Sequence, residues 1–285
     1  MDASTIQPAT HPIDRAGVFV LLVALAATLA SAASPPYLGF DANEYPGDAA
    51  LPALRRSFSF AGYWLNNPPG AKTNDWAGKR TVLLENGFGF LVLFNGRTAS
   101  QLKSSAAAAE LGKADAQSAV ALATREGFHP GAVIFLDQEE GGRMTDAQNA
   151  YIFAWTDTVI ASGFRAGIYC SGIPAKEGHG QSTVTANDIR ARAGGRQISY
   201  FVYNDACPPS SGCVYPAHSS EPSASGVAFA SVWQFAQSPR RREFTKRCAT
   251  TYNADGNCYA LGAGAGSAIL DLDSASSPDP SNGRD

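Results

Sequence analysis

The sequence is poor in charged residues and has no excess of basic ones. Only 16% of its 285 residues are charged, and 22 Lys and Arg against 25 Asp and Glu give a formal net charge of −3. Nucleic-acid binding depends on a positive surface that displaces counterions, so this composition argues against a nucleic-acid partner. A disordered chain is excluded as well, because 45% of the residues are hydrophobic and can form a core.

Several motifs of ligand-binding proteins are also missing. No Gly-rich phosphate fingerprint follows the first expected strand, and no self-similarity recurs at a period of about 20–50 residues. The cysteine spacings do not match a zinc site, and no loop has the spacing of a calcium-binding EF-hand. We therefore expect no cofactor and no metal.

One long hydrophobic stretch lies near the N-terminus. Residues 16–30 carry no charge, and the small-x-small sequence Ala30-Ser31-Ala32 follows them. This pattern predicts a signal peptide over residues 1–33 and an exported protein, either secreted or held in the periplasm or cell envelope. The alternative is an uncleaved membrane anchor, although a bilayer span needs about 20 apolar residues. The membrane would then be contacted through this segment alone.

The cysteines fall in the second half of the chain. Cys207 and Cys213 have five residues between them, and Cys248 and Cys258 have nine, in polar or Gly/Ser-rich surroundings. In an oxidising compartment these spacings predict two disulfides that staple loops. Cys170 lies in an apolar run, which indicates a buried and unreactive thiol.

Eight apolar runs bounded by turn residues predict β-strands, and helical patterns lie between most of them. The runs are 37–41, 60–65, 88–95, 132–139, 165–171, 197–204, 227–235 and 268–273. The helical patterns cover 48–56, 75–85, 104–126, 145–161 and 186–193. This alternation predicts an α/β fold, a single (β/α)8 TIM-barrel-like domain over residues 34–275. A doubly wound open sheet is the alternative.

The last third of the chain fits the barrel pattern less well. Residues 207–226 and 239–266 are long, rich in Gly and Ser, and without helical periodicity, so we expect irregular loops pinned by the two disulfides. Residues 276–285 are polar and predict a disordered tail. We expect the protein to be monomeric.

The acidic residues are concentrated at strand ends. Asp41 ends the first predicted strand, Asp137 and Glu139 end the fourth, and Asp271 and Asp273 end the eighth. Residues two apart on a strand share a face, and barrel enzymes carry their active sites at the carboxyl ends of the strands. We therefore expect these side chains to converge on one cleft.

Clustered carboxylates suit one type of reaction in particular. Like charges and partial burial raise the pKa of one carboxyl group, so that a neutral acid lies beside an anion. Cleavage of a glycosidic bond needs both, a proton for the leaving oxygen and negative charge near the oxocarbenium-like centre. A site for a divalent cation is a weaker alternative, because the ligands would come from distant strands.

Five segments resemble a known family. The segments GFDANEYPG (39–47), AVIFLDQEEGG (132–142), GFRAGIYCSG (163–172), VWQFA (232–236) and AILDLD (268–273) occur in this order. They are similar to the secreted glycoside-hydrolase-like family known as domain of unknown function 1906, a relative of the family 25 lysozymes. The resemblance implies a (β/α) barrel with its cleft at the carboxyl ends of the strands.

The resemblance also implies roles for the acidic residues. Glu139 corresponds to the acid/base glutamate, and Asp137 to the aspartate that orients or stabilises the acetamido group of the substrate. Asp41 corresponds to the acid that ends the first strand, and Asp271 or Asp273 to the acid of the eighth. The sequence departs from the lysozyme pattern in the context LDQEEGG and in the region of strands six to eight.

Other side chains in or near the strands are candidates for substrate contacts. Aromatic rings stack on sugars, and amides bond hydroxyl groups, although an aromatic residue in a strand is more often part of the core. The candidates are Tyr63, Tyr169, Trp233 and Gln234.

These observations predict an exported glycoside hydrolase that acts on a cell-wall or N-acetylated polysaccharide such as peptidoglycan. Glu139, Asp137 and Asp41 are the predicted catalytic residues, and Asp271 and Asp273 are predicted to bind substrate. The alternative is a barrel of the same fold that binds a glycan without cleaving it.

Overall fold

The computed structural model describes residues 1–2, 36–205, 220–237 and 268–285. Contacts divide the chain into Met1–Ala33 and Ser34–Asp285, and the described helices and strands belong to the second unit. The predicted signal peptide therefore lies almost entirely outside the described residues, as do Cys207, Cys213, Cys248 and Cys258 with both predicted disulfides. Within the described segments, no helix is long and apolar enough to cross a bilayer.

Eight strands close into a barrel in the order β1-β10-β9-β8-β5-β4-β3-β2. The strands are β1 (Tyr37–Asp41), β2 (Phe60–Trp64), β3 (Gly89–Asn95), β4 (Val133–Asp137), β5 (Arg165–Ser171), β8 (Ile198–Tyr203), β9 (Val232–Ala236) and β10 (Asp271–Ala275). Each corresponds to one of the eight predicted runs, with shifted ends. The runs are almost continuously apolar because both faces of most strands are buried.

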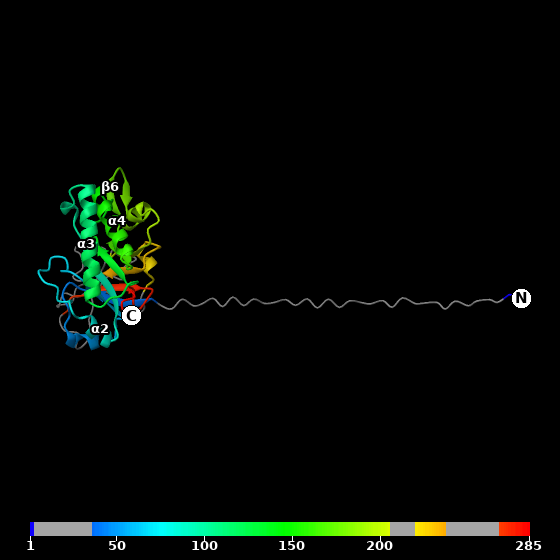
Figure 1. Ribbon diagram of the computed structural model, residues 1–285, viewed down its shortest axis with the longest axis horizontal. Helices are drawn as coiled ribbons and strands as arrows, with labels where there is room; N and C mark the ends of the chain where they lie inside the picture. The colour runs from blue at the N-terminus through cyan, green and yellow to red at the C-terminus, as the bar shows by residue number, and fades with distance from the viewer. Residues whose placement is uncertain (3–35, 206–219, 238–267) are drawn as a thin grey trace. The chain divides into compact units, whose positions relative to one another are not determined.

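The direction of the last strand differs from the prediction. Seven strands are parallel, but β10 runs antiparallel to both of its neighbours, β1 and β9. The expectation of a regular (β/α)8 barrel is therefore wrong at this strand. A parallel strand would require the chain to cross first to the other end of the barrel. Here β10 begins at the end where β9 stops, and Figure 1 shows it in red beside the blue β1.

Five helices lie among the described residues: α1 (Leu51–Leu54), α2 (Arg80–Glu85), α3 (Ser105–Arg125), α4 (Asp146–Ala161) and α5 (Thr185–Arg192). Short 3-10 turns occur at η1 (Asp48–Ala50), η2 (Ala99–Gln101) and η3 (Pro222–Ser225), and β6 (Ala175–Gly178) with β7 (Gln181–Thr183) forms a hairpin.

The two long helices pack side by side on the outside of the barrel (Figure 1). Ser104 caps α3, and Thr145 forms a capping box with Gln148 at the start of α4. The helices approach closely at Gly112, where an added Cβ atom would lie 2.3 Å from the carbonyl oxygen of Tyr151.

The C-terminal residues close the other end of the barrel, so the prediction of a disordered tail is wrong. The Ser281 Oγ accepts a hydrogen bond from the Val92 N–H at 2.8 Å, and its carbonyl accepts one from the Val133 N–H at 2.8 Å. The carboxylate of Asp279 accepts another from the Phe90 N–H at 2.8 Å. Antiparallel β10 leads the chain to the amino ends of β3 and β4. There the tail lies beside the first residues of β3, at a level that the start of β4 does not reach.

Candidate functional site

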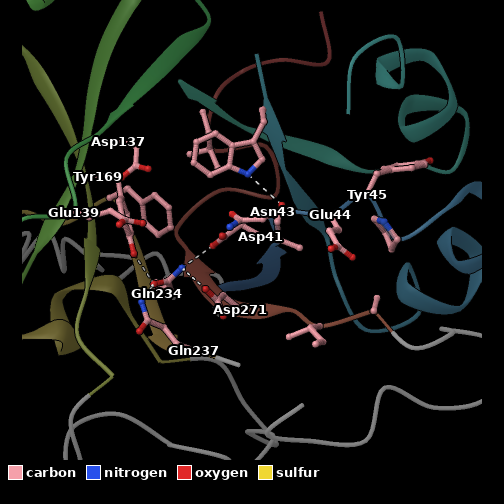
Figure 2. Close-up of a pocket in the computed structure, with 17 residues that line it drawn as sticks. Asp41, Asn43, Glu44, Tyr45, Asp137, Glu139, Tyr169, Gln234, Gln237 and Asp271 are labelled. Atoms are coloured by element: carbon pink, nitrogen blue, oxygen red, sulfur yellow. Dashed lines mark hydrogen bonds between the residues drawn. The ribbon is translucent and has the colours of Figure 1, made fainter. Parts of the chain in front are cut away.

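A hollow of about 420 Å³ opens at the carboxyl ends of the parallel strands, the end called the mouth below. Figure 2 shows Asp137, Glu139 and Tyr169 on one side of it and Glu44 and Tyr45 on the other. The lining residues are Asp41, Ala42, Asn43, Glu44, Tyr45, Pro46, Trp64, Leu93, Asp137, Glu139, Tyr169, Phe201, Gln234, Gln237, Ala268, Ile269 and Asp271. Six of the predicted site residues therefore meet in one cavity, which we call the central hollow.

Asp271 reaches the mouth by a different route from the one predicted. It begins β10 rather than ending it, and it pairs with Asp41 across the two strands. Because β10 is antiparallel, its first residue lies level with the last residue of β1. Asp273, two residues further along, is fully buried and does not line the hollow.

Two of the predicted sugar-contacting residues, Tyr63 and Trp233, lie outside the hollow. Tyr63 is buried, and its hydroxyl group donates to the Glu126 carboxylate. Trp233 is buried, and its Nε1 donates to the Asn204 carbonyl at 3.0 Å. Neighbouring residues on a strand face opposite sides of the sheet. The residues that follow these two in the sequence, Trp64 and Gln234, therefore line the hollow instead. Tyr63 and Trp233 are therefore not placed to contact a sugar in the hollow, as had been predicted.

A chain of hydrogen bonds joins the floor of the hollow. The Tyr169 hydroxyl donates to Gln234 Oε1 at 2.7 Å, and Gln237 Nε2 donates to the same oxygen at 2.9 Å. Gln234 Nε2 in turn donates to Asp41 Oδ2 at 2.8 Å and to Asp271 Oδ2 at 3.3 Å. Gln234 thus fixes the orientation of both carboxylates (Figure 2).

Burial changes the protonation of three of these acids. Loss of solvation raises the pKa of Asp41 from 3.8 to about 6, with hydrogen bonds from Gln234 and Asp273 opposing the rise and the charge of Glu139 adding to it. Burial also raises the pKa of Asp137 well above its usual value, and the charges of Glu139 and Asp41 raise it further. Both effects favour the protonated form of Asp137.

Asp273 is a second buried acid beside Asp41. Burial raises its pKa well above the usual value, and the charges of Asp41 and Asp271 and a hydrogen bond to Asp41 act in the same direction. Among the described residues, no N–H or O–H group donates to either of its carboxyl oxygens. Its own proton is therefore shared with Asp41, and its role is to hold Asp41 in place rather than to contact a ligand in the hollow.

Glu139 lies beyond the end of β4, which stops at Asp137 and not at residue 139 as predicted. Its side chain lines the central hollow and is exposed, whereas that of Asp137 is only 5% exposed. The Tyr203 hydroxyl donates to the Glu139 carbonyl at 2.8 Å and fixes the backbone there. The two acids thus have opposite environments, since Asp137 is buried and Glu139 is open to solvent.

The neighbouring Glu140 anchors this turn. Its carboxylate accepts hydrogen bonds from the Ala99 N–H at 2.8 and 3.0 Å, from Gln148 Nε2 at 2.7 Å and from Gln138 Nε2 at 3.2 Å. These bonds tie the turn that carries Glu139 to η2 and to α4. Glu140 is therefore a positioning residue.

Sequence reasoning missed the rim formed by the loop after β1. Asn43, Glu44 and Tyr45 directly follow Asp41 and line the hollow opposite Glu139. Ile269, an apolar side chain that is 47% exposed, lines it before β10. The first three could have been found, because residues that follow a parallel barrel strand lie at the mouth. No group of three or more His, Cys, Asp or Glu residues in the described segments could hold a metal ion.

Comparisons with known proteins agree with this architecture. Residues 60–193 match the family described as Rv2525c-like, glycoside hydrolase-like domain. A crystal structure of an uncharacterized B. stearothermophilus protein superimposes with a TM-score of 0.54 and 16% identity, over 84% of this chain and 95% of that one. No curated protein matches the chain.

Two further solved structures share the fold. The Tat-secreted Mycobacterium tuberculosis protein Rv2525c, in complex with L-tartrate, has a TM-score of 0.50 and 13% identity, over 85% of this chain and 95% of that one. The spore cortex lytic enzyme SleM of Clostridium perfringens has a TM-score of 0.50 and 12% identity, over 85% of this chain and 68% of that one. At these identities the likeness establishes the fold alone.

Proposed function

This chain contains an Rv2525c-like, glycoside hydrolase-like domain, matched over residues 60–193, and we propose that it cleaves glycosidic bonds of a cell-wall or N-acetylated polysaccharide. The match confirms the family resemblance and includes two of the five segments, 132–142 and 163–172. The observation that carries the proposal is the pairing of Asp137 and Glu139 in one hollow. Asp137 is buried with a raised pKa, which suits a hydrogen-bond donor that orients the substrate, and Glu139 is exposed, which suits a group that exchanges protons with the leaving oxygen and with water.

In the proposed reaction Glu139 is the general acid and base. It is the acid with access to solvent, so it can protonate the leaving oxygen and later take a proton from water. Neutral Asp137 carries a proton that it can donate in a hydrogen bond to the carbonyl oxygen of an acetamido group. Asp41, ionised above about pH 6, supplies negative charge near the oxocarbenium-like centre.

The remaining residues of the hollow would bind and orient the sugar. Tyr169 and Gln234 form the hydrogen-bonded floor, and Asp271 accepts from Gln234, so the three are placed to meet hydroxyl groups. Trp64 and Tyr45 provide aromatic surface at the wall.

The relatives support the substrate class and the location. The C. perfringens relative is described as a spore cortex lytic enzyme, which favours a cell-wall polysaccharide, with peptidoglycan as the first candidate. The M. tuberculosis relative is described as Tat-secreted, which favours export, in line with the predicted signal peptide over residues 1–33.

Replacement of Glu139 by Gln tests the proposal. Removing a general acid and base lowers the rate by roughly 10²–10⁴-fold. We expect Glu139→Gln to lose the release of reducing ends from peptidoglycan or chitin oligomers by at least about 100-fold, with an unchanged thermal unfolding midpoint. Glu110→Gln, on the exposed surface of α3, is the matched control and retains activity.

Two outcomes would contradict the assignment. Unchanged release of reducing ends by Glu139→Gln would remove this residue from the mechanism. Binding of oligosaccharides by the unaltered protein with no product after long incubation would identify a glycan-binding barrel instead of an enzyme.

A further inference from the structure

The central hollow is lined by acidic residues without a cationic one. The acids are Asp41, Glu44, Asp137, Glu139 and Asp271, and its lining among the described residues contains no Lys, Arg or His. A second hollow of about 280 Å³, beside the loops after β2 and β3, shares Asp137 and Glu139 with it. The cation that lines this second hollow, Arg97, is held by both carboxylate oxygens of Asp115 at 2.7 and 2.8 Å. Within the described part of the chain, no lining cation therefore balances the negative charge of the central hollow.

Glu44 differs from the other acids in its position and in its lack of partners. It lies on the loop after β1, across the hollow from Glu139 (Figure 2), and it is exposed. Among the described residues, no hydrogen bond or ion pair engages its carboxylate. Asp48, further along the same loop, has by contrast Lys79 at 2.9 Å and the Tyr45 hydroxyl at 2.7 Å. Glu44 therefore contributes an unpaired carboxylate to the hollow.

The hydrogen-bond donors of the hollow are already in use. Each uncharged lining side chain with an N–H or O–H group donates within the protein, namely Asn43, Tyr45, Trp64, Tyr169, Gln234 and Gln237. The acceptors are not all in use, because no donor of the described residues reaches Asp137 Oδ1, in a side chain that is only 5% exposed. A buried oxygen without a donor lowers stability, and a ligand that supplies an N–H removes this cost. The hollow thus offers a ligand acceptors and negative charge.

These features favour a ligand that donates hydrogen bonds and carries positive charge. A protonated amine has three N–H donors and no acceptor, whereas an acetamido group has one N–H and a carbonyl oxygen that needs a donor. Several carboxylates attract an ammonium group and repel an anionic sugar, and they have no such effect on a neutral one. A bare metal ion does not fit, because no group of three or more His, Cys, Asp or Glu residues in the described segments could hold it.

We propose that the central hollow recognises a sugar unit with a protonated amino group in place of its acetamido group, so that the preferred polymer is a partly de-N-acetylated cell-wall glycan. This inference rests on the proposed function and narrows its substrate class. Glu44 is the residue that determines this specificity, since it adds negative charge on the wall opposite Glu139. Partial de-N-acetylation keeps both kinds of unit in one chain, so an acetamido group can still meet Asp137 while an ammonium group lies beside Glu44.

Replacement of Glu44 by Gln tests the proposal, because it removes the charge and keeps the size of the side chain. Glu85→Gln is the matched control, since Glu85 is exposed at the end of α2, lines neither hollow and loses the same charge. The ligands are chitotetraose and its fully de-N-acetylated counterpart, the amino tetrasaccharide. Calorimetry at pH 6, at low and at high salt, measures the affinity of each protein for both.

We expect the unaltered protein and Glu85→Gln to bind the amino tetrasaccharide at least about tenfold more tightly than chitotetraose at low salt. One exposed ion pair contributes up to about fivefold, and several carboxylates act together here. Glu44→Gln should lower the ratio of the two affinities about fivefold. High salt should reduce the preference of the unaltered protein, because it screens charges that are open to solvent.

Two results would overturn the inference and leave the proposed hydrolase intact, provided that the unaltered protein cleaves N-acetylated glycan. One is equal binding of the two tetrasaccharides by the unaltered protein, and the other is a preference that Glu44→Gln leaves unchanged. If the unaltered protein binds neither tetrasaccharide and releases no reducing ends from peptidoglycan, chitin or partly de-N-acetylated chitin, the proposed function fails and this inference with it.

Discussion

At the end of the barrel away from the mouth, the side chains of buried Ser281 and partly buried Asp279 bond backbone amides of β3. At the mouth, Asp137 and Gln138 keep buried oxygens that no N–H or O–H donor of the described residues reaches. The first arrangement satisfies amides that would otherwise be buried without a partner, so it stabilises the fold. The second costs stability, and it lies beside the cavities where a ligand can supply the missing donors. This contrast supports the proposed function at the mouth and a stabilising role for the closed end.

Arg80 shows that the closed end is not free of unsatisfied atoms. Its Nε has no partner among the described residues, yet its Nη2 donates to the carbonyls of Gly283 and Asp285 at 2.7 and 3.1 Å. The guanidinium also lies over the rings of Phe90 and Phe128, 5.7 and 5.0 Å from their centroids. Ring contacts and tail carbonyls offset the cost there, and no cavity adjoining the mouth is involved.

Removal of the tail would have the largest effect on stability. Deletion of residues 277–285 breaks at least five hydrogen bonds between the tail and the barrel, which at about 1 kcal/mol each amounts to a loss of about 5 kcal/mol in the free energy of unfolding. Urea denaturation measures this loss. Deletion of residue 285 alone is the control and should cost less than about 1 kcal/mol. A full deletion as stable as the intact chain would refute the stabilising role of the closed end.

The pH dependence of stability would show the cost at the mouth. Asp41 has a pKa of about 6 in the folded state and 3.8 as an unperturbed group, so between these values the folded protein holds a proton that the unfolded chain has released. The contribution of Asp41 to the free energy of unfolding is therefore greatest at acid pH and falls as the pH rises to about 6. This contribution decreases by about 3 kcal/mol in total, because each pKa unit corresponds to about 1.4 kcal/mol. The raised pKa values of Asp137 and Asp273 act in the same direction.

Urea titrations at pH 5 and pH 7.5 on the unaltered protein and on Asp41→Asn isolate this term from the other carboxylates. We expect the variant to gain stability relative to the unaltered protein when the pH is raised. If the difference in free energy of unfolding between the two proteins is the same at both pH values, burial of Asp41 does not lower the stability as described above.

Much of the fold could be predicted because strands and helices leave local signals. Apolar runs marked the eight strands of the barrel but not the hairpin β6-β7, and the caps at Ser104 and Thr145 marked the long helices. The direction of β10 could not be predicted, since an apolar run carries no information about whether its neighbours are parallel. The ordered tail was missed because its composition is polar, and the bonds of Ser281 and Asp279 to strand amides depend on tertiary structure.

The site was predictable to the extent that it lies at strand ends. Asp41 and Asp137 follow from the rule that barrel chemistry lies at the carboxyl ends of strands, and Asp271 was placed correctly although its strand runs the other way. Tyr63 and Trp233 were misplaced because an apolar run does not reveal which of two adjacent residues faces inward. Gln138 was missed, since the lack of a hydrogen-bond partner is visible only in three dimensions.

The central claim is that the carboxyl group of Asp137 is retained for a ligand at a cost to the fold. Asp137→Leu tests both halves, because it replaces an unsatisfied buried acid by an apolar side chain next to two cavities with room for it. Removing such a group is neutral or stabilising. We predict that at pH 7.5 the variant has a free energy of unfolding equal to that of the unaltered protein or up to about 2 kcal/mol higher, and that its glycan cleavage falls at least about 100-fold. A variant that is less stable and cleaves glycan at the original rate would contradict the account.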